Sequence, residues 1–369
     1  MTYSQIEIQL IGILVASACA LSGVFLMLRR MAMLSDAISH AILFGLVLAF
    51  FITEDLNSPL LIIAATLTGI LTVSLVEILN KTRLVREDAS IGLIFPLLFS
   101  LGVILISRYA GNIHLDTDTV LLGELAFAPF DRFTIGGLDF GPKSIYIIGV
   151  VLLLNIAFIA IFYKELKLST FDAGLAASLG FAPGMLHYAL MTIVSITAVG
   201  SFEAVGSVLV VAFMITPPAT AFLLTDQLSH MIWLSVSIGA LSAVSGYWLA
   251  HLLDASIAGS MATMCGIAFV IAFLFAPNRG IIAMIRLRIR QKWEFAQIML
   301  AVHLFQHENL PLESFERRLD HCHRHLRWTE SFANHVVRLA TDNKLMVEKN
   351  GYLLLTDHGR QKAREAMSQ

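Results

Sequence analysis

Charged residues are scarce in this sequence. Asp, Glu, Lys and Arg together make up 14% of its 369 residues, whereas hydrophobic residues make up 57%. Because ordinary soluble domains carry about 25% charged residues, this composition excludes a typical soluble globular protein. It predicts a polytopic membrane protein.

Cysteines are also few. The three of them, Cys19, Cys265 and Cys322, lie far apart, so a disulfide framework is not expected. A glycine-rich phosphate-binding loop with its lysine is missing too, which argues against an ATPase site in this chain. We do not expect a cleavable signal, because residues 6–28 are long enough to span a membrane and no basic region precedes them.

The basic residues are concentrated toward the C-terminus. About 15 of the 25 Lys and Arg residues follow Pro277. This shift predicts a transmembrane domain over residues 1–280, a basic linker over 281–292 and a small soluble domain over 293–369.

Long apolar runs dominate the first part of the chain. We predict nine membrane-spanning helices, at about residues 6–28, 34–52, 58–79, 89–107, 144–163, 185–200, 204–224, 230–252 and 258–276. The sixth is the shortest, so eight spans is the alternative count.

The basic residues of the short loops predict the orientation. If the N-terminus is outside, most of them face the cytoplasm, in agreement with the positive-inside rule. These are Arg29, Arg30, Lys81, Arg83, Arg86, Lys164 and Lys167, against Arg108, Arg132 and Lys143 outside. The basic tail then also lies inside.

An acid and an imidazole stand out at the start of the second span. Asp36 and His40 are four positions apart, which places them on one face of a helix. An ionisable residue in a membrane span costs about 2.5–3.5 kcal/mol on insertion scales, so it indicates function. Asp with His is also a ligand set for a divalent metal ion. The alternative is structural: Asp36 caps the helix and His40 makes a buried hydrogen bond.

Two further segments carry unusual patterns. Residues 168–180 predict one short amphipathic helix on the cytoplasmic face, with Ser169 or Thr170 as its cap, Asp172 in its first turn and Gly180 at its end. Residues 205–221 predict a span that is broken by Pro217 and Pro218. Such a break suits a helix that lines a pore, although ordinary helix packing is the alternative.

The outer segment 109–142 is long for a loop. It carries His114, Asp116, Asp118 and Glu124, and residues 121–127 could form a short interfacial helix. A solvated loop is the simpler interpretation, and a contact surface for a substrate-delivering partner is the sharper one. Weaker ligand candidates lie near the ends of spans: Glu77, Glu203, His251 and Asp254.

The tail has the element order of a winged helix. We predict helices at 293–307, 312–324 and 329–344, a hairpin at 345–355 around an Asn-Gly turn, and a last helix at 357–366 that begins at Thr356 as its cap. His321, Cys322 and His325, with His335, invite a metal-sensing interpretation, but their spacing matches no standard zinc motif. A solvated helix is preferred there. About ten acids nearly balance the basic residues of the tail, so a regulatory or ATPase-contacting module is favoured over nucleic-acid binding.

Taken together, these motifs resemble the metal ABC-3 permeases, the membrane subunits of ABC importers for zinc, manganese and iron. The resemblance covers about residues 8–280. It rests on residues 30–40 (RMAMLSDAISH), 86–92 (REDASIG), 170–172 (TFD) with Ala176 and Gly180, 205–221 (VGSVLVVAFMITPPATA) and 275–277 (FAP). The tail is more loosely similar to winged-helix domains of metal-dependent repressors, around residues 355–360.

The resemblance implies an all-α membrane fold like that of the vitamin B12 permease, in a bacterial plasma membrane. It implies a second permease copy, identical or paralogous, with two cytoplasmic ATP-binding subunits and an external metal-binding protein. The permease would bind no ATP and no permanent cofactor. Its cargo would be a divalent metal, with manganese favoured because the tail resembles repressors of manganese and iron uptake.

Site roles follow from the same resemblance. Asp36 and His40 would bind the ion in transit. Thr216, Pro217 and Pro218 would shape a helix of the pore. The ATPase would dock on a coupling helix that includes Thr170, Phe171, Asp172, Ala176 and Gly180.

Two other functions remain open from the sequence. A secondary transporter driven by an ion gradient would need no ATPase-docking segment and would often show repeated halves, which the sequence does not show clearly. A membrane-tethered transcriptional regulator would sense metal with its spans and bind DNA with its tail.

Overall fold

The computed structural model describes residues 2–54, 58–109, 125–135, 138–308, 317–318, 326–349 and 351–368. The chain divides into two compact units, residues 1–279 and residues 280–369.

The first unit is a bundle of membrane-spanning helices. Within the described residues, nine helices are long and apolar enough to cross a membrane, which confirms the predicted number. They are α1 (Tyr3–Leu28), α2 (Met33–Thr53), α3 (Pro59–Lys81), α4 (Glu87–Tyr109), α6 (Lys143–Ile161), α9 (Pro183–Val205), α10 (Ser207–Leu224), α11 (Leu228–Leu253) and α12 (Ile257–Phe275). The span predicted as the shortest, α9, has 23 residues.

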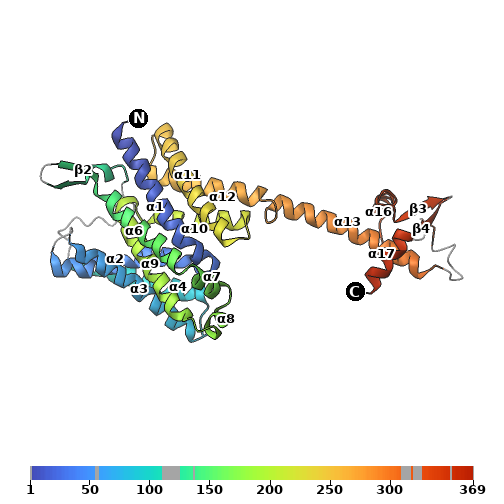
Figure 1. The fold of residues 1–369 in the computed structure, drawn as a ribbon, viewed down its shortest axis with the longest axis horizontal. Helices are drawn as coiled ribbons and strands as arrows, with labels where there is room; N and C mark the ends of the chain where they lie inside the picture. Colours follow the sequence, from blue (N-terminus) through green and yellow to red (C-terminus); the bar gives the residue numbers. More distant parts are fainter. Residues whose placement is uncertain are drawn as a thin grey trace. The chain divides into compact units, whose positions relative to one another are not determined.

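Helix α1 lies at the centre of this bundle and packs against α6, α9, α10 and α11 (Figure 1). Small residues allow its neighbours to approach closely. At Gly23 the approach is extreme, because a Cβ atom there would lie 2.0 Å from the backbone oxygen of Met214 on α10. Only glycine fits at this crossing.

Helix α10 runs without interruption through Pro217 and Pro218, so the predicted break is wrong. A proline has no N–H for the carbonyl four residues earlier, which leaves the carbonyls of Phe213 and Met214 without their helical partners. Close packing supports this stretch from outside: both prolines are buried, and the Met214 oxygen lies against α1 at Gly23.

Part of the predicted outer loop has regular structure. A short 3-10 helix, η1 (Ala128–Phe130), precedes an antiparallel hairpin of β1 (Arg132–Ile135) and β2 (Leu138–Pro142), which the sequence did not predict. Arg132 joins this hairpin to α1 through Glu7, with Nη2 and Oε1 3.2 Å apart. The Arg132 guanidinium, together with the N–H of Gly141, also lowers the pKa of the Asp139 carboxyl.

Other predictions for this loop concern residues outside the described part of the structure. His114, Asp116, Asp118 and Glu124 lie outside the described residues, as do residues 121–124 of the expected interfacial helix.

The second unit combines helices with one hairpin: α13 (Ile281–Gln306), α16 (Glu330–Asp342), β3 (Met346–Lys349), β4 (Tyr352–Leu355) and α17 (Asp357–Met367). Its core gathers apolar residues of both α13 and the hairpin, including Leu300, Leu304, Met346 and Leu353. The expected linker, 281–292, forms the first turns of α13. Most of the expected helix at 312–324 lies outside the described residues.

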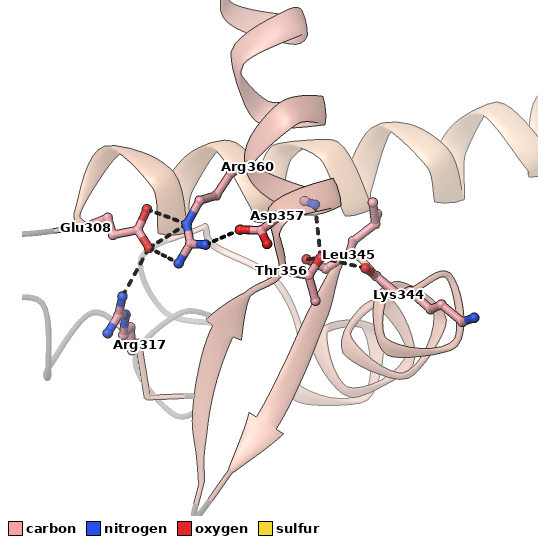
Figure 2. Close-up of polar contacts among 8 residues, drawn as sticks. Glu308, Arg317, Lys344, Leu345, Thr356, Asp357 and Arg360 are labelled. Carbon is pink, nitrogen blue, oxygen red and sulfur yellow. Dashed lines mark hydrogen bonds and ion pairs between the residues drawn. The ribbon is translucent and has the colours of Figure 1, made fainter.

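A charged cluster holds the end of α13 to the start of α17 (Figure 2). Arg360 donates to both carboxylate oxygens of Glu308 at 2.8–3.2 Å, and Arg317 Nη2 lies 3.5 Å from the same carboxylate. Thr356 begins α17 by accepting a hydrogen bond from the N–H of Gly359, and it donates one to the carbonyl of Lys344. The predicted Thr356 cap is therefore confirmed.

Candidate functional site

Asp36 and His40 face each other on α2, one helical turn apart. Asp36 Oδ1 lies 3.3 Å from His40 Nε2, and 39% and 30% of their side-chain surfaces are exposed in the single chain. The structural alternative does not hold, because the N-cap of α2 is Ala32 and His40 is not buried. Instead, the imidazole ring of His40 packs against Phe95 and Phe99 of α4, at centroid distances of 5.6 and 5.9 Å.

The neighbouring face of the same turns is buried. Ser35 and Ser39 are buried, and their hydroxyls donate to the carbonyls of Ala32 and Ser35. The helix therefore presents its acid and imidazole on one partly exposed face, while the hydroxyls on the neighbouring buried face are satisfied within the helix.

The pair alone offers one oxygen and one nitrogen ligand. Among the described residues, no three His, Cys, Asp or Glu side chains gather closely enough to hold a metal ion. The weaker candidates have other surroundings: Glu77 pairs with Lys81 at 3.0 Å, His251 lies against Trp248, and Asp254 ends α11 in a left-handed conformation. Glu203 is exposed on α9.

Residues 163–178 form two helices, α7 (Tyr163–Phe171) and α8 (Ala173–Ser178), so the single predicted helix is wrong. The break falls at Asp172, whose backbone is extended and whose carboxylate accepts the N–H of Leu175 at 2.8 Å. Asp is a strong N-cap, and here it starts a helix at the position where we expected a first turn. Neither Ser169 nor Thr170 caps this segment.

Only some of the residues named for this segment point outward. The Phe171 side chain is 63% exposed, whereas Ala176 is fully buried. Thr170 accepts a hydrogen bond from Arg29, and Gly180 ends α8 with a positive φ of 87°. Sequence reasoning missed Leu175 and Leu179, which lie beside Phe171 in sequence and are 47% and 60% exposed. The available signal was their spacing of four residues, which places two side chains on the same face of a predicted helix.

The two prolines of α10 lie inside the bundle. Pro218 contacts α1 near Gly23, and Pro217 lies near Gly239 of α11. Thr216 is half-buried. The remaining candidates of the tail, His321, Cys322 and His325, lie outside the described residues.

Comparison with known proteins identifies the family. Residues 3–276 match the model of the ABC 3 transport family. The chain belongs to the ABC 3 transport family. It is 46% identical over 349 residues to the zinc transport system membrane protein TroD of Treponema pallidum, an alignment that covers 95% of each chain. It is 48% identical over 271 residues to the manganese transport system membrane protein MntD of Bacillus subtilis, which covers 73% of this chain and 92% of that relative.

Solved structures agree with this assignment. PsaBC from Streptococcus pneumoniae in complex with Fab has 28% sequence identity and a TM-score of 0.63, over 76% of this chain and 94% of the other. An inward-facing metal-chelate type ABC transporter shares the fold, with 20% identity and a TM-score of 0.54.

The family assignment establishes the general role of the chain. It is a multi-pass membrane permease subunit of a bacterial metal ABC importer, in a family whose members transport zinc, manganese or iron. Such permeases have no ATPase site of their own; they work with ATP-binding subunits and an extracytoplasmic binding protein.

The relatives differ in the second unit. The TroD alignment covers so much of both chains that it must extend well beyond residue 279. The MntD alignment leaves only 8% of that relative unmatched, which is too little for a second unit of this size. The bundle is thus the part that these importers share.

Proposed function

We propose that this permease passes a divalent metal ion through a path in which Asp36 and His40 bind it in transit. The observation that carries the proposal is the geometry of the pair: a carboxylate oxygen and an imidazole nitrogen 3.3 Å apart, on the partly exposed face of a membrane helix. Desolvating such polar groups in a membrane is costly, and a passing dication compensates for it. The oxygen and nitrogen donors suit Mn²⁺, Zn²⁺ and Fe²⁺, and the lack of thiolates disfavours Cu⁺.

A second permease copy completes the site. One chain supplies two ligands, which is fewer than these ions take in stable protein sites. Both side chains are partly exposed in the single chain, so another copy, identical or related, can bring its own carboxylate and imidazole to the same ion. A site shared in this way binds when the copies approach and releases when they separate, as transport requires.

The ATPase docks on α7–α8 in this proposal. Phe171, Leu175 and Leu179 expose apolar surface at the end of the bundle where the short helices lie. That end also carries Arg29, which contacts Ser169 and Thr170, as well as most of the basic loop residues. By the positive-inside rule it is the cytoplasmic end, which puts the N-terminus outside and the second unit in the cytoplasm.

The second unit is a winged-helix-like regulatory module in this proposal. The MntD relative of Bacillus subtilis lacks room for such a unit, which fits a regulatory role better than a part of the transport path. Its hairpin follows α16 directly, as the wing of a winged helix follows the third helix.

The test substitutes the two ligands and two matched controls. We expect Asp36→Asn and His40→Gln to lower uptake of manganese, zinc and iron by at least roughly 10–100-fold. Substituting residues that only hydrogen-bond to metal ligands already lowers affinity or activity by that factor. Glu54→Gln, at the far end of α2, and His230→Gln, on α11, change exposed side chains of the same types and should transport normally. The measurement is isotope uptake into cells at matched permease levels, with each metal supplied separately. Wild-type uptake by both ligand variants would exclude this path.

A further inference from the structure

Arg29 lies at the turn between α1 and α2. It follows the last residue of α1, Leu28, as the C-cap, and Arg30 then reverses the chain in a left-handed conformation, with φ of 62°. Helix α2 begins at Met33, only three residues before Asp36. Any displacement of this turn therefore reaches the start of the helix that carries the proposed ion ligands.

The Arg29 side chain reaches across 140 residues of sequence to α7. Its Nη2 donates to Ser169 Oγ at 3.0 Å, and its Nε donates to Thr170 Oγ1 at 3.2 Å. The Ser169 hydroxyl gives its own hydrogen to the carbonyl of Leu166, so its lone pairs can accept from Arg29. The third contact is to His187 Nδ1, on the first turn of α9, at 3.4 Å. A guanidinium has no acceptor, so in this contact the imidazole accepts.

None of the groups that bind Arg29 carries a negative charge: two are hydroxyls and the third is an imidazole. Within the described residues, no carboxylate lies within ion-pair distance of this half-buried cation. A positive charge at the end of α1 does interact favourably with the helix dipole, but that effect needs no particular partner. The dipole effect therefore does not explain why the guanidinium binds α7 and α9 at the same time. The rigid, planar set of N–H donors of Arg suits such a double contact.

We propose that Arg29 is a positioning residue that transmits movement of the ATPase-docking helices α7–α8 to the α1–α2 turn and so to Asp36 and His40. This inference rests on the proposed docking role of α7–α8. Thr170 immediately precedes Phe171, whose exposed ring belongs to the docking surface. Arg29 joins that segment to the turn, and Arg30, in its left-handed conformation, is the point about which the turn can move.

The test compares two loop arginines in the assembled transporter, which is the permease with its ATPase and binding protein in proteoliposomes. The readout is metal transported per ATP hydrolysed, with manganese and zinc as probes. In Arg29→Ala we expect hydrolysis to continue and this ratio to fall about tenfold, equivalent to about 1.4 kcal/mol of coupling. Arg29→Lys should fall similarly, because one ammonium group cannot reproduce this planar set of donors. Arg86→Ala, which removes an exposed guanidinium from another short loop, should keep the wild-type ratio.

A second variant removes the acceptor and leaves the arginine in place. Thr170→Val has nearly the same shape, and we expect it to lower the same ratio. Combined with Arg29→Ala, it should add little, since both substitutions break one interaction. Metal binding by the purified permease should stay unchanged in each variant.

Three results would overturn the proposal: a wild-type ratio in Arg29→Ala, additive effects of Arg29→Ala and Thr170→Val, or loss of the ATPase from purified Arg29→Ala. The last would mean that Arg29 only shapes the docking surface. Leu175→Asp separates the two proposals, because it should release the ATPase. If the ATPase stays bound in that variant while Arg29→Ala uncouples, the proposed docking residues are wrong, and Arg29 couples α7 to the turn without docking at Leu175.

Discussion

In the bundle of residues 1–279 large apolar side chains cover the outside, whereas in the second unit, from Ala296 onward, they form the inside. Leu153 on α6 is 67% exposed and Trp233 on α11 is 73% exposed. In the second unit, Leu300, Met346 and Leu353 are almost fully buried. The two regions differ because lipid accepts apolar surface and water does not.

Polar groups show the reverse arrangement. The bundle buries hydroxyls, such as Ser39 and Thr72, which donate to carbonyls of their own helices. The second unit instead pairs its charges, and the partly buried Glu308 carboxylate binds Arg360. Helices in lipid are therefore held together by small residues and close contact, and those of the second unit by apolar burial.

Gly23→Ala should have the largest effect, because it tests close contact directly. The added Cβ would lie 2.0 Å from the Met214 oxygen, so α1 and α10 would have to separate. We expect little or no monodisperse permease after detergent extraction, as measured by size-exclusion chromatography. Gly149→Ala is the matched control on α6, since its added Cβ would meet nothing within 4 Å. Equal yields of the two variants would contradict the importance of this crossing.

Leu153→Asp and Val347→Asp place the same charge at two exposed positions. On α6 the charge would face lipid and cost about 2.5–3.5 kcal/mol of insertion free energy, so we expect reduced membrane-integrated protein. On β3, Val347 is 42% exposed to solvent, and the change should be nearly neutral. Membrane fractionation of both variants measures the difference. A strong loss from Val347→Asp would mean that this face of the hairpin is covered.

Thr356→Ala should have the smallest effect, confined to the second unit. It removes the hydroxyl that accepts from Gly359 at the start of α17, and losing such a cap costs about 1 kcal/mol. Hydrogen exchange of peptides from residues 351–368 should therefore be faster, with the bundle unchanged. Thr341→Ala on α16, whose hydroxyl bonds back to the carbonyl of Val337 within the helix, is the control. Protection that changes equally in the two variants would exclude a capping role.

Local patterns predicted most of the elements. In the part of the chain that the structure describes, the nine apolar runs correspond to nine long helices, because the length of a run separates a membrane span from a soluble helix. The Asn-Gly turn and the Thr356 cap are short-range signals, and both lie where the structure has a hairpin and a helix start. The 3.3 Å contact of Asp36 and His40 follows from their spacing on one helix.

Prediction failed where two local signals disagreed, or where a contact with a distant part of the chain determined the local structure. Two prolines indicated a break in α10, but packing against Gly23 keeps the helix continuous. Asp172 could occupy a first turn or a cap, and its bond to Leu175 selected the cap. The outer hairpin β1–β2 is anchored by Arg132 to Glu7, a partner that no local pattern reveals.

The sequence by itself determined the kind of protein and the face that Asp36 and His40 share, and it limited the number of spans to eight or nine, because composition, run length and helical period are properties of neighbouring residues. Only the tertiary structure decided that Arg29 binds Ser169 and Thr170, and that Gly23 meets Met214. These contacts join residues far apart in the chain, and their geometry depends on how whole helices cross rather than on any stretch that can be read alone.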